Sequence, residues 1–241
     1  MNMHTSGLFG RSRTLQESGI LRNGRDRHSH ILFGVDDGVS TPEESLQALA
    51  YEEGAGISEV WCTPHIMEDL PNGSDMLRRR FEELSSMYTG PVRLRLAAEY
   101  MLDSLFLERL QKGDLLVMDE DMLLVETSTA GAPYRFEDML KDILSAGYRP
   151  VLAHPERYHF LSTDDYARLR RTGVLLQMNI GSICGFYGKD SRMRAERLLK
   201  EDLYSLYGSD CHNAEVMKHQ YGEIRLSREI LNKVAQLDCI L

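Results

Sequence analysis

The chain has few cysteines and no long apolar run. Its four cysteines, at positions 62, 184, 211 and 239 of 241 residues, form no Cys-x-x-Cys pair. This spacing argues against a dense disulfide framework and a structural zinc site, and predicts free thiols in a reducing cytoplasm. No apolar run approaches the roughly 20 residues of a membrane span. The N-terminus also lacks the apolar stretch of a secretory signal, so we expect a cytoplasmic protein without a membrane span.

Basic residues are also fewer than acidic residues. The chain carries 28 Lys and Arg against 37 Asp and Glu, which gives a net charge of -9 and a pI of about 5.4. Nucleic acid backbones attract clustered Lys and Arg, so this balance argues against nucleic acid as a partner. An anionic substrate has to be attracted by local positive charge, such as metal ions or a few arginines. Apolar residues make up 42% of the chain, as is typical of a globular protein.

Strand-like runs alternate with amphipathic helical segments along most of the chain. One helix is predicted after Thr41, where Pro42 suits the first turn and Glu44 completes a capping box. Further helices are expected at 74–87, 105–111, 136–146, 164–172, 192–201 and from 215 onward. Strands are expected at 57–62, 92–97, 122–125, 150–153, 174–179 and 203–207. About seven βα units indicate an α/β fold whose parallel strands form a nearly closed barrel.

The chain divides into a short first segment and one large domain. Residues 1–24 are rich in Ser, Gly and Arg and show no periodicity, so we expect an N-terminal arm. The barrel domain is expected to span residues 25–241, because the alternation of strands and helices continues to the end. This length fits one domain better than two.

Histidines and carboxylates follow the predicted strand ends. They are His28, His30, His65, Glu99, Glu126, His154, Asp210 and His212, and Asp36 and Asp37 lie in a glycine-bounded loop after the first pair. In a parallel barrel the carboxyl ends of the strands converge on the face where active sites lie. His28 with His30, and Asp210 with His212, are also spaced so that both side chains point the same way on an extended segment. We therefore expect one cluster.

This mixture of donors predicts a metal site. Imidazole nitrogen with carboxylate oxygen suits Zn, Mn or Fe better than Ca or Mg. The candidate ligands exceed what one ion uses, so we expect two or three divalent ions bridged by carboxylates. Ions ~3.5–4 Å apart polarise a phosphoryl oxygen, lower the pKa of a bound water and stabilise the leaving oxygen. The sequence thus predicts hydrolysis of a phosphate ester by a metal-bound hydroxide.

Structural roles compete with these assignments. A single histidine at a strand end is usually structural or solvated, and a single buried glutamate more often pairs with an arginine. Eight candidates at successive strand ends favour the metal interpretation. Arg157 is suited either to hold a phosphate bidentately or to form a surface ion pair with Glu156 or Asp164. His212 suits a metal ligand better than a general acid for the leaving oxygen.

Seven motifs follow one another between residues 25 and 215. They read HSHILFGVDDG, TPHIMED, AEY, VETS, LAHPERY, QMNIGSICGFYG and GSDCHN. In this order they resemble the PHP-superfamily protein-tyrosine phosphatases of the CpsB, CapC and YwqE type. The resemblance implies a distorted (β/α)7 TIM-like barrel of the PHP type and a trinuclear site, usually with manganese or iron. By matched motif it implies the metal ligands His28, His30, Asp37, His65, Glu99, Glu126, His154, Asp210 and His212, and phosphate binding by Arg157.

The resemblance also implies a substrate and a partner. It implies a metal-dependent protein-tyrosine phosphatase that acts on the phosphotyrosine tail of a bacterial tyrosine kinase controlling capsular or exopolysaccharide synthesis. The chain departs from the family at two places. Some members carry an arginine shortly after the SDxHN motif, whereas this chain offers only Lys218 as a replacement. Arg27 stands where an apolar strand residue is usual, so its charge has to reach solvent or a carboxylate such as Asp26.

Three other functions compete with this one. A PHP phosphatase for a small phosphomonoester such as histidinol phosphate shares the same motifs. A cysteine-dependent tyrosine phosphatase needs Cys-x5-Arg, but the sixth residue after Cys62, Cys184 and Cys211 is Glu68, Asp190 and Met217, and Cys239 has no room. A non-catalytic barrel should have lost ligands, and none is missing. Whether the chain forms a homo-oligomer stays open.

Overall fold

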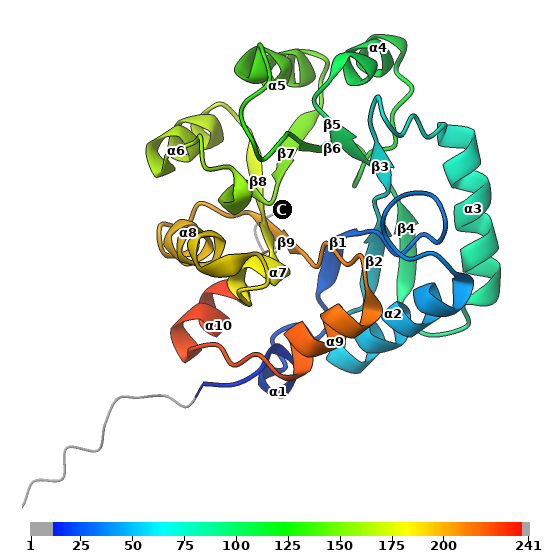
Figure 1. The fold of residues 1–241 in the computed structure, drawn as a ribbon, viewed down its shortest axis with the longest axis vertical. Helices are drawn as coiled ribbons and strands as arrows, with labels where there is room; N and C mark the ends of the chain where they lie inside the picture. The colour runs from blue at the N-terminus through cyan, green and yellow to red at the C-terminus, as the bar shows by residue number, and fades with distance from the viewer. Residues whose placement is uncertain (1–11, 238–241) are drawn as a thin grey trace, which may run out of the picture.

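A computed structural model describes residues 12–237, and its strands curl around a centre that the helices enclose (Figure 1). The strands are β1 Arg25–Ser29, β2 Glu59–Cys62, β3 His65–Ile66, β4 Arg93–Leu96, β5 Glu99–Met101, β6 Met122–Glu126, β7 Arg149–Ala153, β8 Leu175–Asn179 and β9 Leu206–Gly208. Each pairing between these strands is parallel. The expected α/β fold with parallel strands is therefore confirmed.

The strands form a distorted barrel with seven strand positions. One sheet has the order β1-β2-β4 and the other the order β3-β5-β6-β7-β8-β9. Strand β2 continues into β3 across 63–64, and β4 continues into β5 across 97–98, so the nine strands occupy seven positions. The two sheets meet where the His30 N–H donates to the Cys211 carbonyl at 3.0 Å. The result is a curled parallel sheet of the kind that the sequence predicts.

The outer layer consists of helices, and the sequence predicted the approximate ends of most of them. They are α2 Pro42–Ala55, α3 Ser74–Met87, α4 Ser104–Lys112, α5 Phe136–Ser145, α6 Thr163–Arg171, α8 Gly188–Lys200, α9 Ala214–Gly222 and α10 Arg228–Val234. The predicted capping box is present at α2, where the Glu44 N–H donates to the Thr41 hydroxyl at 3.3 Å. Gly56 ends α2 with a φ of 86°, a conformation that glycine adopts without strain.

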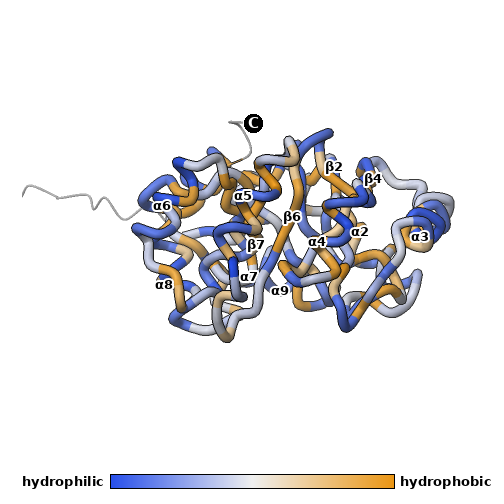
Figure 2. Tube along the Cα trace, turned by 90° about the horizontal axis from the view of Figure 1, so that it is seen from above, coloured by the Kyte–Doolittle hydropathy of each residue, from blue (hydrophilic) through white to orange (hydrophobic). Residues whose placement is uncertain are grey.

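Apolar side chains fill both the barrel and the space under the helices. Figure 2 shows the hydrophobic strand β6 inside and the hydrophilic helix α3 at the outside. Met122 and Leu124 point into the barrel, where they pack with Trp61, Val151 and Leu206. Because side chains alternate along a strand, the next inward position after Leu124 is Glu126 at the strand end. The apolar interior thus gives way to polar side chains at the carboxyl ends of the strands.

Part of the expected N-terminal arm is packed against the barrel. Residues 12–24 include the short helix α1 Leu15–Ser18, and the side chains of Leu15 and Leu21 are 1% and 0% exposed. Arg13 exchanges two backbone hydrogen bonds with Leu226, at 3.0 and 2.8 Å. This part of the segment therefore does not project from the domain. Residues 1–11 of the expected arm lie outside the described residues.

Arg27 and three of the cysteines are buried in the domain. The Arg27 side chain is buried, and its guanidinium pairs with the carboxylate of Asp119, as its expected need for a carboxylate or solvent requires. Asp26 accepts a hydrogen bond from the Ser209 hydroxyl at 2.6 Å. Cys62, Cys184 and Cys211 are buried free thiols as expected, and Cys239 lies outside the described residues. Within residues 12–237, no helix combines the length and apolar character of a membrane span.

Candidate metal centre

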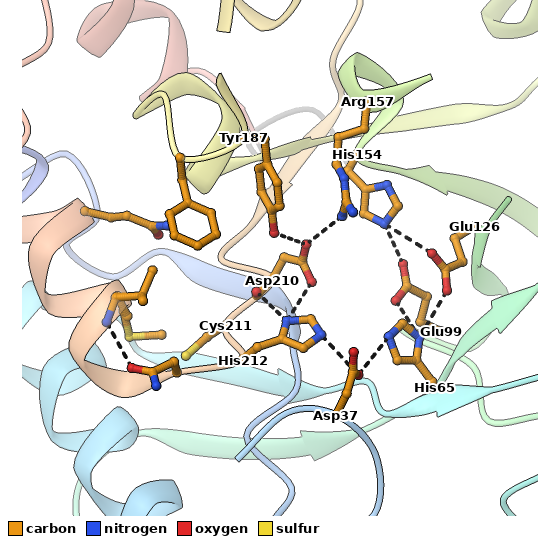
Figure 3. A pocket seen from close by; sticks show the side chains of 15 residues that line it. Asp37, His65, Glu99, Glu126, His154, Arg157, Tyr187, Asp210, Cys211 and His212 are labelled. Atoms are coloured by element: carbon orange, nitrogen blue, oxygen red, sulfur yellow. Dashed lines mark hydrogen bonds and ion pairs between the residues drawn. The ribbon is translucent and has the colours of Figure 1, made fainter. Parts of the chain in front are cut away.

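One pocket at the carboxyl ends of the strands is lined by seven of the nine predicted ligands (Figure 3), and the other two, His28 and His30, contact Glu99 in its wall. His28 lies in β1, His65 begins β3, Glu99 begins β5 and Glu126 ends β6. The remaining predicted ligands come from the loops that follow β1, β7 and β9, and they are His30, Asp37, His154, Asp210 and His212. The pocket measures about 320 Å³. The barrel therefore brings together residues that are up to 184 positions apart (28 to 212).

Glu99 occupies the centre of the cluster. Its Oε2 atom lies 3.2 Å from His28 Nε2, 3.3 Å from His30 Nε2 and 3.1 Å from His65 Nδ1. Its other oxygen, Oε1, lies 3.0 Å from His154 Nε2. The side chain of Glu99 is fully buried. One carboxylate therefore contacts four imidazoles, the arrangement expected of a ligand shared between ions.

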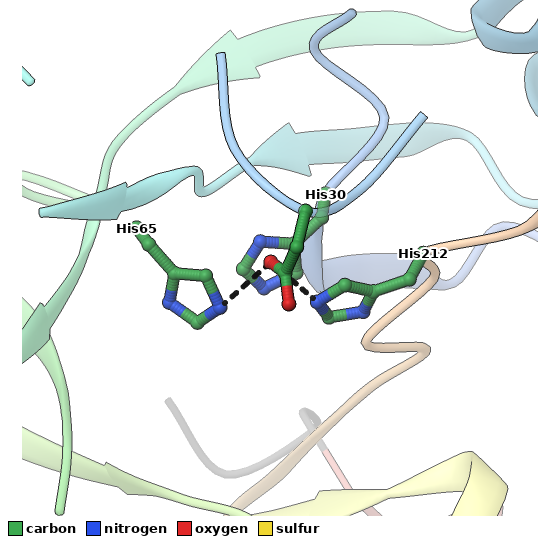
Figure 4. Close-up of side chains that lie close together, drawn as sticks. His30, His65 and His212 are labelled. Atoms are coloured by element: carbon green, nitrogen blue, oxygen red, sulfur yellow. Dashed lines mark ion pairs between the residues drawn. The ribbon is translucent and has the colours of Figure 1, made fainter. Parts of the chain in front are cut away.

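A second group lies nearer to solvent (Figure 4). Asp37 Oδ1 is 3.4 Å from both His65 Nε2 and His212 Nε2, and its side chain is 74% exposed. The His30 ring lies between these two imidazoles, with centroids 4.3 Å from His65 and 4.0 Å from His212. Glu126 Oε1 lies 3.1 Å from His65 Nδ1. His30 and His65 thus belong to both the buried and the outer part of the cluster.

The donor atoms fit divalent cations. The Nε2 atoms of His28 and His30 face each other at 3.0 Å, and Glu99 Oε2 accepts no hydrogen bond from the described residues. Donors this close to each other can surround one ion at the ~2.0–2.2 Å typical of nitrogen and oxygen ligands. Three such donor groups are present, namely His30 with Asp37, His65 and His212; His28 with His30 and Glu99; and His65 with Glu99 and Glu126. The overlap of these groups matches closely spaced ions.

Without a cation, electrostatics in the cluster favour protonated His28, His30 and His65 beside an ionised Glu99, whereas burial and the charge of His30 lower the pKa of His212. Burial lowers the pKa of His65, but its close contacts with the Glu126 and Glu99 carboxylates raise it to about 11. Burial and the charge of His65 lower the pKa of His30, but Asp36 and Glu99 raise it to about 10. Burial raises the pKa of Glu99, yet the nearby histidines hold it well below its usual range. Protons therefore supply the positive charge that cations would bring.

Two side chains behind the cluster orient its histidines. The His30 Nδ1–H donates to Asp36 Oδ2 at 2.8 Å, and the His28 Nδ1–H donates to Gln177 Oε1 at 2.6 Å. Each bond turns the Nε2 atom toward the pocket, as partners of metal-bound imidazoles do. The roles of Asp36 and Gln177 were not apparent from the sequence. The inward-facing position of Gln177 in β8 was the signal that could have identified it.

Asp210 links the cluster to further polar groups. Its Oδ1 atom lies 3.4 Å from both His28 Nε2 and His30 Nε2. Its Oδ2 atom accepts hydrogen bonds from Asn179 Nδ2 at 2.6 Å and from the Tyr187 hydroxyl at 3.1 Å. Asp210 has a φ of 52°, a conformation that is uncommon outside glycine and concentrates at functional sites. Asn179 and Tyr187 were also missed in the sequence, because their roles depend on contacts between distant segments.

Arg157 lines the pocket as a candidate anion-binding group. Its Nη1 atom lies 3.4 Å from Asp210 Oδ2, and its guanidinium lies 4.4 Å from the centre of the Tyr187 ring. Its ion-pair partner is thus Asp210 and neither Glu156 nor Asp164. The Glu156 carboxylate is buried and accepts a hydrogen bond from the Tyr204 hydroxyl at 2.8 Å. Arg157 therefore lies where the predicted phosphate-binding role requires a guanidinium, and this role stays a prediction.

Lys218 and His212 both contact carboxylates or carbonyls near the pocket. The Lys218 amine pairs with Glu215 at 3.4 Å, and Lys218 is not among the residues that line the pocket. The His212 Nδ1–H donates to the Asp210 carbonyl at 3.0 Å, which leaves Nε2 facing Asp37. This tautomer suits a metal ligand.

Comparison with known proteins agrees with the geometry of the predicted metal site. The family described as capsular polysaccharide synthesis, CpsB/CapC, matches residues 25–237. The tyrosine-protein phosphatase CpsB of Streptococcus pneumoniae is 30% identical over 205 residues, which cover 79% of this chain and 83% of that protein. The tyrosine-protein phosphatase YwqE of Bacillus subtilis is 28% identical over 203 residues, which cover 79% of this chain and 78% of that protein.

Solved structures agree on the fold. A structure from the work on YwqE of B. subtilis and CpsB of S. pneumoniae, described there as metal-dependent tyrosine phosphatases, superposes with a TM-score of 0.76. It is 24% identical and covers 88% of this chain and 86% of its own. The phosphotriesterase homology protein of Escherichia coli superposes at 0.55 with 10% identity, over 90% of this chain and 99% of its own. The chain therefore belongs to the CpsB/CapC family and is a homologue of its metal-dependent tyrosine-protein phosphatases.

Proposed function

We propose that this protein is a metal-dependent protein-tyrosine phosphatase that hydrolyses phosphotyrosine in a protein substrate. The observation that carries the proposal is the convergence of nine histidine and carboxylate side chains, seven of which line one pocket with Arg157 while His28 and His30 contact Glu99 in its wall. Membership of the CpsB/CapC family supports the same activity.

We propose that two to three divalent ions, with manganese as the first candidate, bind in this pocket. The proposed ligands are His28, His30, Asp37, His65, Glu99, Glu126, His154, Asp210 and His212. When bound, the ions supply the positive charge that activates water and stabilises the phosphoryl group. Asp36 and Gln177 hold the His30 and His28 rings in place.

Arg157 and His212 are the proposed catalytic residues beside the ions. Arg157 binds the phosphate, because its guanidinium is held at the pocket wall by Asp210 and Tyr187 and carries a charge at every physiological pH. His212 holds its Nε2 atom toward the outer part of the cluster, where it contributes a ligand. The three free cysteines are buried, and burial raises the pKa of the pocket-lining Cys211 well above its usual range, which opposes a thiolate nucleophile.

The biological setting of the proposal follows from the family. The CpsB/CapC family is described by capsular polysaccharide synthesis, which supports the phosphotyrosine tail of a bacterial tyrosine kinase as the substrate. The buried free cysteines support a reducing compartment such as the cytoplasm.

A metal analysis paired with substrate comparison tests the proposal. We expect at least two metal ions per chain, and turnover of a phosphotyrosine peptide that exceeds turnover of histidinol phosphate. His65→Ala removes an imidazole shared by two donor groups, so turnover should fall by about 100-fold or more. The matched control is His219→Ala, which removes a histidine on the exposed part of α9. A protein that prefers histidinol phosphate would support a small-molecule phosphatase, and a metal-loaded protein without turnover would support a non-catalytic barrel.

A further inference from the structure

One large apolar side chain remains exposed at the mouth of the pocket. Phe186 is 56% exposed and lines the same pocket as the metal cluster. The other exposed large hydrophobic residues among those described, Met87, Tyr134 and Met193, do not line it. Because burying apolar surface is favourable, an exposed aromatic ring at a binding site is a ready contact for a ligand.

The Phe186 ring is held in place by its own loop. The loop follows the short helix α7 Ile180–Ile183, and the Phe186 N–H donates to the Gly181 carbonyl at 2.8 Å. Gly185 precedes it with a φ of 88°, which turns the chain at a cost that only glycine avoids. The ring also meets the Tyr187 ring edge-on, with centroids 5.0 Å apart and planes at 84°. The loop backbone and the Tyr187 ring therefore position Phe186 at the pocket.

Tyr187 connects this ring to the anion-binding end of the pocket. Its hydroxyl donates to Asp210, and the Arg157 guanidinium lies over its ring. In Figure 3 Tyr187 lies beside Asp210, away from Glu126 and His65. Because Tyr187 is already engaged by these partners, Phe186 supplies the available aromatic surface. Val216 and Met217 of α9 add further apolar lining to the same pocket.

We propose that Phe186 determines specificity by contacting the aromatic ring of an aryl phosphate whose phosphate group binds at the metal cluster and Arg157. This inference rests on the proposed function. Aromatic pairs contribute binding beyond the area that they bury. An alkyl phosphate such as phosphoserine has no ring to place against Phe186, so the residue selects aryl over alkyl esters.

Binding and turnover measurements on the metal-loaded protein test this role. Phenylphosphonate and methylphosphonate are not hydrolysed, so calorimetry reports their affinities directly. Phosphotyrosine and phosphoserine peptides of one sequence give the ratio of kcat/KM. Phe186→Ala should weaken phenylphosphonate and lower phosphotyrosine kcat/KM by about tenfold, and change methylphosphonate by less than about twofold. Phe186→Trp should retain the aryl preference, and Met193→Ala, an exposed control on α8, should match the wild type.

The outcomes separate the two proposals. If Phe186→Ala binds and hydrolyses aryl and alkyl compounds in the wild-type ratio, the role of Phe186 is overturned and the phosphatase function stands. An equal loss for both compounds also overturns it, because such a loss reports a disturbed pocket. If the wild-type protein binds neither phosphonate and hydrolyses neither peptide, the proposed function and this role fall together.

Discussion

Hydrogen bonds to the ring nitrogens that face away from the pocket position the proposed histidine ligands. Asp36 shows this most clearly, because its buried side chain accepts both the His30 Nδ1–H and the backbone N–H of His65 at 3.1 Å. Asp37, the next residue, is mostly exposed and points to the outer imidazoles. Two adjacent aspartates thus have different roles, which their order in the sequence did not distinguish.

Replacing Asp36 tests whether the orientation of His30 matters for metal binding. Asp36→Asn keeps the shape of the side chain but removes the charge that fixes the His30 ring. We expect metal affinity to fall by about 10- to 100-fold while the fold is retained. Competition with a chelating dye measures the affinity. Asp164→Asn, at the exposed start of α6, is the control. Equal affinities in Asp36→Asn and the wild type would show that His30 is held without Asp36.

Arg157 offers a second test at the level of one side chain. Arg157→Lys keeps the charge, but a lysine cannot bind a phosphate through two parallel hydrogen bonds or stack flat on Tyr187. We expect kcat/KM for a phosphotyrosine peptide to fall by about 10- to 100-fold, with metal content unchanged. Steady-state kinetics and elemental analysis measure the two quantities. A variant with wild-type kinetics would mean that the phosphate contacts another group.

Individual elements bring these residues into place through their register. In β8 the alternation of side chains turns Gln177 and Asn179 toward the pocket, where they contact His28 and Asp210. The interruption of one strand at 63–64 lets His65 begin β3, opposite Glu99 at the start of β5. The offset between the paired residues is the same before the interruption, where Cys62 lies opposite Leu96, so the parallel register itself places the two ligands side by side.

The segment before β1 stabilises the domain through its buried leucines. Leu21 is 0% exposed, so Leu21→Ala leaves a cavity in the core. We expect the free energy of unfolding to fall by about 2–5 kcal/mol. Urea denaturation followed by circular dichroism measures this loss, and Met193→Ala on exposed α8 is the control. A change below about 0.5 kcal/mol would show that residues 12–24 pack only loosely on the barrel.

At the scale of the whole molecule, the cluster couples metal binding to stability. A cation that binds the folded chain alone raises the melting temperature by mass action. We expect a chelator to lower the melting temperature by roughly 5–10 °C, and added manganese to restore it. Differential scanning calorimetry with and without the chelator checks this. An unchanged melting temperature in a protein shown to contain metal would contradict this coupling between metal binding and stability.

The stabilisation of the fold by metal binding should decrease as the pH falls. In the metal-free protein the pKa of His30 is about 10 and that of His65 is about 11, so both carry protons at neutral pH. A metal ion has to displace these protons, and lowering the pH strengthens their competition. The stabilisation by metal should therefore shrink as the pH falls below about 10, and it should continue to shrink through neutrality into the acidic range.

The sequence by itself determined the local elements and the chemical types at the strand ends. Helix α3 spans 74–87 as predicted, and the capping box of α2 is present, because both depend on residues within a few positions of each other. Parallel βα units also require their strand ends to share one face, so the convergence of the histidines and carboxylates followed from the pattern alone.

Only the tertiary structure decided the contacts between distant segments. Arg27 pairs with Asp119, 92 residues away, and Gln177 contacts His28, 149 residues away. The packing of Leu15 and Leu21 and the exposure of Phe186 beside the cluster also depend on which surfaces meet. Local periodicity carries no information about such pairs, because the free energy of each contact depends on neighbours that the chain brings close only when the barrel forms.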